Sequence, residues 1–80
     1  MAYTIKGLAK ANECENLDCS GLAQLWDYWY ACNSNEYGRN RIRSDFKLLR
    51  KKDRQEMINY LRMYSDYYPN VLNAVLSAIY

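Results

Sequence analysis

The strongest functional signal in the sequence is a basic stretch between residues 39 and 54. It carries eight lysines and arginines against two aspartates, a net charge of +6, whereas the whole chain carries only +2. The remaining residues are mildly acidic, with −3 over residues 1–38 and −1 over residues 55–80. Such a cationic row can neutralise phosphates or dock on the acidic surface of a protein. The polarised charge argues against a nucleic-acid mimic, which would need a strongly acidic surface.

If the basic stretch is helical, five of its cations share one broad face. They are Arg43, Lys47, Arg50, Lys51 and Arg54, at i, i+4, i+7, i+8 and i+11. Arg39 and Arg41, at or before the helix start, can reach out as an arm. Three interpretations stay open: a nucleic-acid contact, docking on an acidic protein patch, and a solvated face that only favours solubility. The lack of helix-turn-helix spacing weakens the first.

Tyrosines beside the basic stretch extend this candidate surface. The chain has nine tyrosines and two tryptophans, more than a small core can hold, so some aromatic surface should be exposed. Aromatic side chains beside arginine can stack on bases or act as hot spots of a protein interface. Four tyrosines, at 60, 64, 67 and 68, follow one side of a predicted helix. We therefore predict these partner-binding residues: Arg39, Arg41, Arg43, Lys47, Arg50, Lys51, Arg54, Tyr60, Tyr64 and Tyr67.

Catalysis and metal binding find little support in the residue types. The chain has three cysteines, Cys14, Cys19 and Cys32, and no histidine, whereas a zinc site normally takes four ligands. It also lacks a glycine-rich phosphate loop and an instructive carboxylate pair. We expect no enzyme activity, no metal and no cofactor. An odd cysteine count without a signal peptide indicates a reducing cytoplasm, that of the host cell if the protein is virus-encoded.

The element that must position this surface is a helix over about 20–33. Leu22, Leu25, Trp26, Trp29 and Tyr30 fall on one stripe of helical period, and this stripe holds both tryptophans. A buried tryptophan removes roughly 150–250 Å² from water. A chain of 80 residues buries only about 60% of its extended surface, so a single domain over residues 1–80 depends on this helix.

Local patterns predict four further helices, at about 4–12, 41–51, 53–67 and 70–80. Thr4 is the expected N-cap of the first, and Asp18 or Ser20 that of the central helix. The capping-box pattern of Asp53 and Glu56 begins a new helix, in place of one continuous helix over 41–67. Residues 33–40, including Gly38, are expected to form a loop.

Pro69 fits the first turn of the last helix, because its missing N–H costs nothing there. The apolar stripe of that helix should pack on the tryptophan face; its members are Val71, Leu72, Val75, Leu76 and Ile79. No stretch has a strand pattern. The predicted fold is an all-α single-domain bundle of four to five short helices.

In texture the chain resembles small accessory proteins of bacteriophages and mobile elements: one short domain, rich in tyrosine and asparagine, with a polarised surface. Such proteins often inhibit a host or defence complex by occupying a surface. We therefore predict a small non-enzymatic inhibitor whose partner is the acidic surface of a protein or nucleoprotein complex. The alternatives are a nucleic-acid-binding protein that uses residues 39–54, and a structural subunit of a homo-oligomer such as a homodimer. We expect no membrane partner, since no apolar run approaches about 20 residues.

Overall fold

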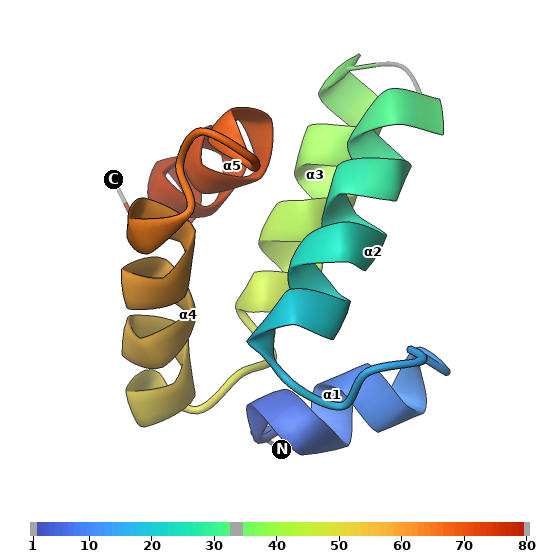
Figure 1. Cartoon of the computed structure of the whole chain (residues 1–80), viewed down its shortest axis with the longest axis vertical. Helices are drawn as coiled ribbons and strands as arrows, with labels where there is room; N and C mark the ends of the chain where they lie inside the picture. The colour runs from blue at the N-terminus through green and yellow to red at the C-terminus, as the bar shows by residue number, and fades with distance from the viewer. Residues whose placement is uncertain (1, 33–34, 80) are drawn as a thin grey trace.

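The helix that carries both tryptophans lies at the centre of the molecule, as predicted. The computed structural model describes residues 2–32 and 35–79. Its five helices are α1 (Ile5–Ala11), α2 (Cys19–Cys32), α3 (Asn35–Phe46), α4 (Lys51–Met63) and α5 (Pro69–Ile79). Figure 1 shows α2 and α3 side by side, with α1 across their lower end and α4 and α5 on the left. The all-α fold of one small domain is therefore confirmed.

Trp26 is the largest side chain that is completely buried. Leu22 and Trp26 are fully buried and Trp29 nearly so, while Leu25 and Tyr30 pack against the core from its edge. The Trp26 ring meets the Phe46 ring of α3 edge to face, with the ring centroids 6.4 Å apart. This geometry is favourable for aromatic pairs. The tryptophan stripe therefore forms the core, as the helical period indicates.

A polar network joins α1, α2 and α3 beside this core. The Oδ2 atom of Asp45 accepts hydrogen bonds from Trp26 Nε1 at 3.0 Å and from Asn12 Nδ2 at 3.1 Å. Burial raises the pKa of the Asp45 carboxyl, and the two donors together with Arg41 only partly oppose this effect. The carboxylate thus satisfies a buried indole N–H at the cost of its own desolvation.

Replacing Asp45 should separate the gain from its hydrogen bond to Trp26 from the cost of burying its carboxylate. Asp45→Ala leaves the indole N–H of Trp26 without an acceptor and should cost about 1–3 kcal/mol, whereas Asp45→Asn keeps an acceptor oxygen and should cost less. The raised native pKa means that the native state holds the proton to higher pH than the unfolded state. The stability of wild type relative to Asp45→Asn should therefore fall as pH rises from about 3 to 7. Urea unfolding at several pH values measures this difference, and a rise with pH would contradict the assignment.

The loop predicted over 33–40 is wrong for residues 35–40, which form the first turns of α3; residues 33 and 34 lie outside the described residues. Gly38 is buried inside this helix because α2 passes very close. A Cβ atom on Gly38 would lie 2.8 Å from the carbonyl oxygen of Trp29 and 2.9 Å from Cα of Tyr30. This glycine therefore serves the contact between α2 and α3, not a turn.

The basic stretch is divided earlier than predicted, since the helix expected at about 41–51 is α3 and ends at Phe46. Tyr3 causes the division by pairing with the chain between α3 and α4. The Tyr3 N–H donates to the Leu48 carbonyl at 2.7 Å, and the Arg50 N–H donates to the Tyr3 carbonyl at 2.8 Å. The chain turns at residues 47–48, pairs with Tyr3 at Leu49 and leaves Leu49 buried.

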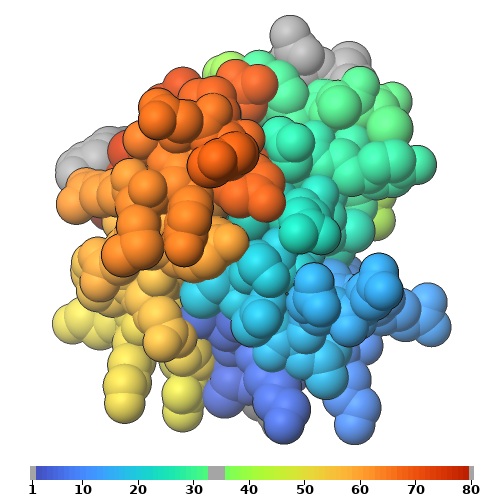
Figure 2. Space-filling model, in the orientation of Figure 1, coloured from blue at the N-terminus to red at the C-terminus, as the bar shows by residue number. Residues whose placement is uncertain are grey.

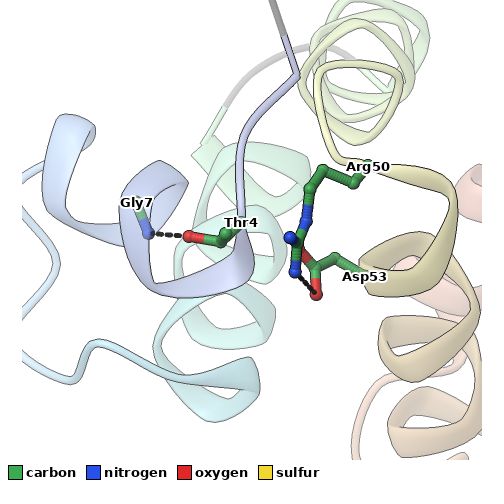
Figure 3. A network of polar contacts seen from close by, with 4 residues as sticks. All are labelled: Thr4, Gly7, Arg50 and Asp53. Carbon is green, nitrogen blue, oxygen red and sulfur yellow. Dashed lines mark hydrogen bonds and ion pairs between the residues drawn. The ribbon is translucent and has the colours of Figure 1, made fainter.

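The capping box predicted at Asp53 is also wrong, because α4 begins at Lys51 with Arg50 as its N-cap residue. Asp53 lies in the first turn and is buried, and its carboxylate binds the Arg50 guanidinium with an Nε–Oδ2 distance of 2.8 Å (Figure 3). Asp53 is therefore the third residue of α4, and its side chain binds Arg50 instead of capping the start of the helix. By contrast, Thr4 caps α1 as predicted, since its Oγ1 accepts from the Gly7 N–H at 2.9 Å (Figure 3).

The last two helices form where the sequence predicts them, but α4 ends earlier than predicted. α4 ends at Met63 instead of 67, because the N–H groups of Tyr67 and Tyr68 both bond to the Tyr64 carbonyl and turn the chain into α5. Pro69 is the first residue of α5, as expected. α5 packs against α2, α3 and α4. Its outermost apolar residue, Ile79, is 50% exposed and thus does not join the core.

Candidate functional site: a cationic groove

The ten predicted partner-binding residues do not form one surface. The prediction that five cations share one face of a continuous helix is wrong, since Arg43 lies in α3, Lys47 follows that helix, and the other three lie in or just before α4. The break at residues 47–50 interrupts the helical spacing that the prediction required. The structure divides the ten residues among three regions and two intramolecular contacts.

Three of the cations gather at one groove between α3, α4 and α5. The groove has a volume of about 360 Å³. Its cations are Lys47, Lys51 and Arg54, and its other lining residues are Phe46, Gln55, Ile58, Ala78 and Ile79. Three elements distant in sequence therefore contribute to it: the end of α3, the first two turns of α4 and the last turn of α5.

Local geometry explains how α4 presents its part of the groove. Lys51, Arg54, Gln55 and Ile58 are spaced i, i+3, i+4 and i+7, so they share one helical face. Ile58 is buried on the core side of that face, whereas Lys51 and Gln55 are exposed. The start of α4, yellow in Figure 2, extends separate side chains from the lower left of the molecule. The groove thus combines an apolar floor with a cationic rim.

The cations of the groove are not neutralised within the described part of the chain. Among residues 2–32 and 35–79, the single ion pair joins Arg50 to Asp53. That contact raises the pKa of the Arg50 guanidinium through a hydrogen bond and the charge of Asp53. Arg43 is likewise engaged, since its Nε donates to Ser77 Oγ at 2.7 Å. Arg50 and Arg43 therefore serve intramolecular contacts, while Lys47, Lys51 and Arg54 have no ion pair with a described residue.

The second region lies on α3, where Arg41 covers a tryptophan. The guanidinium carbon of Arg41 is 4.1 Å from the ring centroid of Trp29, a cation–π contact. Arg39 is exposed on the same helix. Neither residue lines the groove. The predicted arm is thus part of a helix, with one of its two arginines packed on the core edge.

The third region is aromatic and lies at the other end of α4. The rings of Tyr60 and Tyr64 have centroids 4.7 Å apart, and those of Tyr64 and Tyr67 are 6.3 Å apart. Tyr67 is 73% exposed, and the orange segment around residues 60–70 covers the upper left of the face in Figure 2. Tyr60 follows Ile58 by two positions, about 200° around the helix axis. Tyr60 therefore lies on the opposite side of α4 from the groove, and Tyr64 and Tyr67 follow the end of that helix.

The cysteine, aspartate and glutamate side chains are the other groups that could carry chemistry. In the described ranges, no group of three or more cysteine, aspartate or glutamate residues could hold a metal ion. Burial, together with the charges of Glu56, Asp18 and Asp53, raises the pKa of the Cys19 thiol to about 11. This thiol is therefore protonated at neutral pH and a poor nucleophile. Cys14 and Cys32 are also free thiols.

Comparison with known proteins supplies no name for this arrangement. No protein-family model, curated protein or solved structure matches the chain. Within the described residues, no helix is both long and apolar enough to span a membrane. The groove and its charges are thus the observations from which a function is argued.

Sequence reasoning missed the apolar half of the groove. Phe46, Ile58 and Ile79 match the core-facing period of their helices, and this pattern does not reveal that all three meet at one opening. One signal was available: an apolar residue that follows two cations on the same helical face, as Ile58 follows Arg54 by one turn and Lys51 by two, is typical of an amphipathic binding face. Only the packing of α5 beside this face completes the groove.

Proposed function

We propose that the protein is a small non-enzymatic binding protein that occupies an acidic surface of a macromolecular complex and thereby inhibits it. The observation that supports this proposal is the groove, where Lys47, Lys51 and Arg54 border an apolar floor without intramolecular ion pairs in the described residues. Apolar contacts supply affinity, and complementary charges supply specificity and speed of association.

An acidic protein partner fits this arrangement better than a nucleic acid does. A helix that follows a phosphate backbone presents a row of cations, and the row expected over residues 43–54 is interrupted at the end of α3. Two members of that row, Arg43 and Arg50, already bind side chains of the same chain. The apolar floor contributes little to phosphate contacts but adds to a protein interface.

The mode of action follows the small inhibitors of phages and mobile elements that the chain resembles in texture. Such a protein acts by blocking a surface, and this requires no catalytic residue. We place it in the cytoplasm, that of the host cell if it is virus-encoded, where its three free thiols stay reduced.

Charge reversal at the groove should abolish binding to acidic polypeptides. We would replace Lys47, Lys51 and Arg54 with Glu, and measure binding of labelled poly-glutamate, duplex DNA and single-stranded RNA across a salt series. The wild type should bind poly-glutamate in preference to both nucleic acids. The groove variant should lose roughly tenfold or more in affinity for poly-glutamate, because attraction becomes repulsion at three positions.

The matched control reverses three exposed cations away from the groove, Lys6, Lys10 and Arg62. Both triple variants carry the same net charge, so a loss confined to the groove variant assigns binding to that site. Tight binding of unrelated DNA or RNA sequences near physiological salt, with a steep salt dependence that the groove variant removes, would instead establish the nucleic-acid function.

A further inference from the structure

We infer that the groove takes a short acidic peptide segment that inserts one large apolar side chain and places carboxylates on both sides of it. This inference rests on the proposed function and specifies the partner's chemistry at the same site. It is carried by three properties of the groove: its length, its apolar floor and the number of its cations.

The length of the groove suits a segment and not an extended surface. Its α4 side runs over the eight residues from Lys51 to Ile58, a length of about 10 Å. A partner helix contacts such a length with about two turns, and an extended chain with about three residues. One side chain can therefore occupy the centre while its neighbours reach both ends.

The floor of the groove is built for an apolar anchor. Ile58 and Ala78 are apolar lining residues, and Ile79, which also lines the groove, is 50% exposed although the other members of its apolar stripe are buried or partly buried. A volume of about 360 Å³ is at the lower end of the range for pockets that enclose small ligands. Filling it with a leucine or an aromatic ring would remove the exposed part of Ile79 from water.

The cations exclude two other kinds of occupant. A fatty acid or a similar amphiphile carries a single carboxylate, which leaves two of Lys47, Lys51 and Arg54 unpaired. A single-stranded nucleic acid offers several charges but binds through bases stacked on exposed aromatic rings. Among the lining residues that the structure describes, the only aromatic one is Phe46, and it is 1% exposed. Several carboxylates around one apolar side chain satisfy both the rim and the floor.

The test uses labelled helical peptides of about three turns. The first carries a central leucine with glutamates one turn before and after it; the second has alanine in place of the leucine; the third has lysines in place of the glutamates. Fluorescence anisotropy with the full chain should show that the leucine peptide binds roughly tenfold or more tightly than the alanine peptide. The lysine peptide should not bind.

A variant that fills the groove without changing charge locates the anchor. Gln55 lines the groove and is exposed, so Gln55→Trp should occupy the space and reduce binding of the leucine peptide to the level of the alanine peptide. Asn73→Trp adds the same side chain at an exposed position of α5 that does not line the groove, and it should bind like wild type. Circular dichroism of both variants checks that they are folded.

Each contrary result has a distinct meaning. Equal binding of the leucine and alanine peptides, lost on charge reversal of the groove, overturns the anchor and leaves the proposed function in place. Failure of every acidic peptide and of poly-glutamate to bind the folded chain overturns both. If DNA or RNA displaces the bound peptide at a lower concentration than poly-glutamate does, the inference and the proposed function are both overturned. Sedimentation could also show that the wild type is a dimer and that Gln55→Trp is a monomer. That result would mean that the groove binds a second copy of the chain, and it would overturn the inference.

Discussion

Trp26→Ala should leave most of the chain unfolded at room temperature. Trp26 is completely buried, contacts the Phe46 ring and donates its indole N–H to Asp45. Truncation of a buried tryptophan costs about 3–5 kcal/mol, and here it also removes a donor from a half-buried carboxylate. Small domains are stable by only about 5 kcal/mol or a little more. Urea and thermal unfolding followed by far-ultraviolet circular dichroism measure the loss.

Two companion variants separate packing from hydrogen bonding. Trp26→Phe keeps a ring in the core but loses the indole N–H, so its cost should fall between wild type and Trp26→Ala. Tyr28→Ala, on the same helix, removes a ring that is 64% exposed and should change stability by no more than about 0.5 kcal/mol. If Trp26→Ala unfolded cooperatively at the wild-type midpoint, the core would have to lie elsewhere.

Gly21→Ala should be the second most damaging of these substitutions, although it adds only a methyl group. A Cβ atom at Gly21 would lie 1.9 Å from the carbonyl oxygen of Asn16 and 2.9 Å from its carbonyl carbon. Both are backbone atoms, so the connection between α1 and α2 or the start of α2 must move. Overpacking of this kind costs typically 1–3 kcal/mol, occasionally more. Chemical unfolding should show a lower midpoint.

Gly7→Ala is the matched control, because it introduces the same methyl group near the start of another helix. Its Cβ atom would lie 3.0 Å from Thr4 Oγ1, a side-chain atom that can adjust. Alanine also has a helix propensity about 1 kcal/mol better than glycine. We therefore expect Gly7→Ala to be neutral or stabilising. Equal destabilisation by both substitutions would show that the close approach of Asn16 to Gly21 is not the cause.

The five helices were predictable because each has a local cause. Helical period marked the tryptophan face of α2, and Thr4 and Pro69 marked the starts of α1 and α5. These signals act within one or two turns, so they do not depend on distant parts of the chain. The same holds for the uneven charge, which is a property of composition and position alone.

The errors arose where a distant segment overrides the local pattern. The break between α3 and α4 depends on two backbone hydrogen bonds with Tyr3, more than 40 residues away. The capping signal at Asp53 failed because α4 begins at Lys51, directly after this pairing, so Asp53 lies inside the helix and its carboxylate binds the Arg50 side chain. Gly38, typical of a turn, lies within α3 because α2 needs close approach. No local rule contains these contacts.

The candidate site shows the same division. The sequence by itself determined that residues 39–54 are strongly basic and that some tyrosines must be exposed, because charge and aromatic content do not depend on folding. Only the tertiary structure decided which cations act together, since Lys47, Lys51 and Arg54 meet at the groove while Arg43 and Arg50 bind within the chain. It also brought Ile79 beside them, because packing of α5 joins segments that no sequence spacing relates.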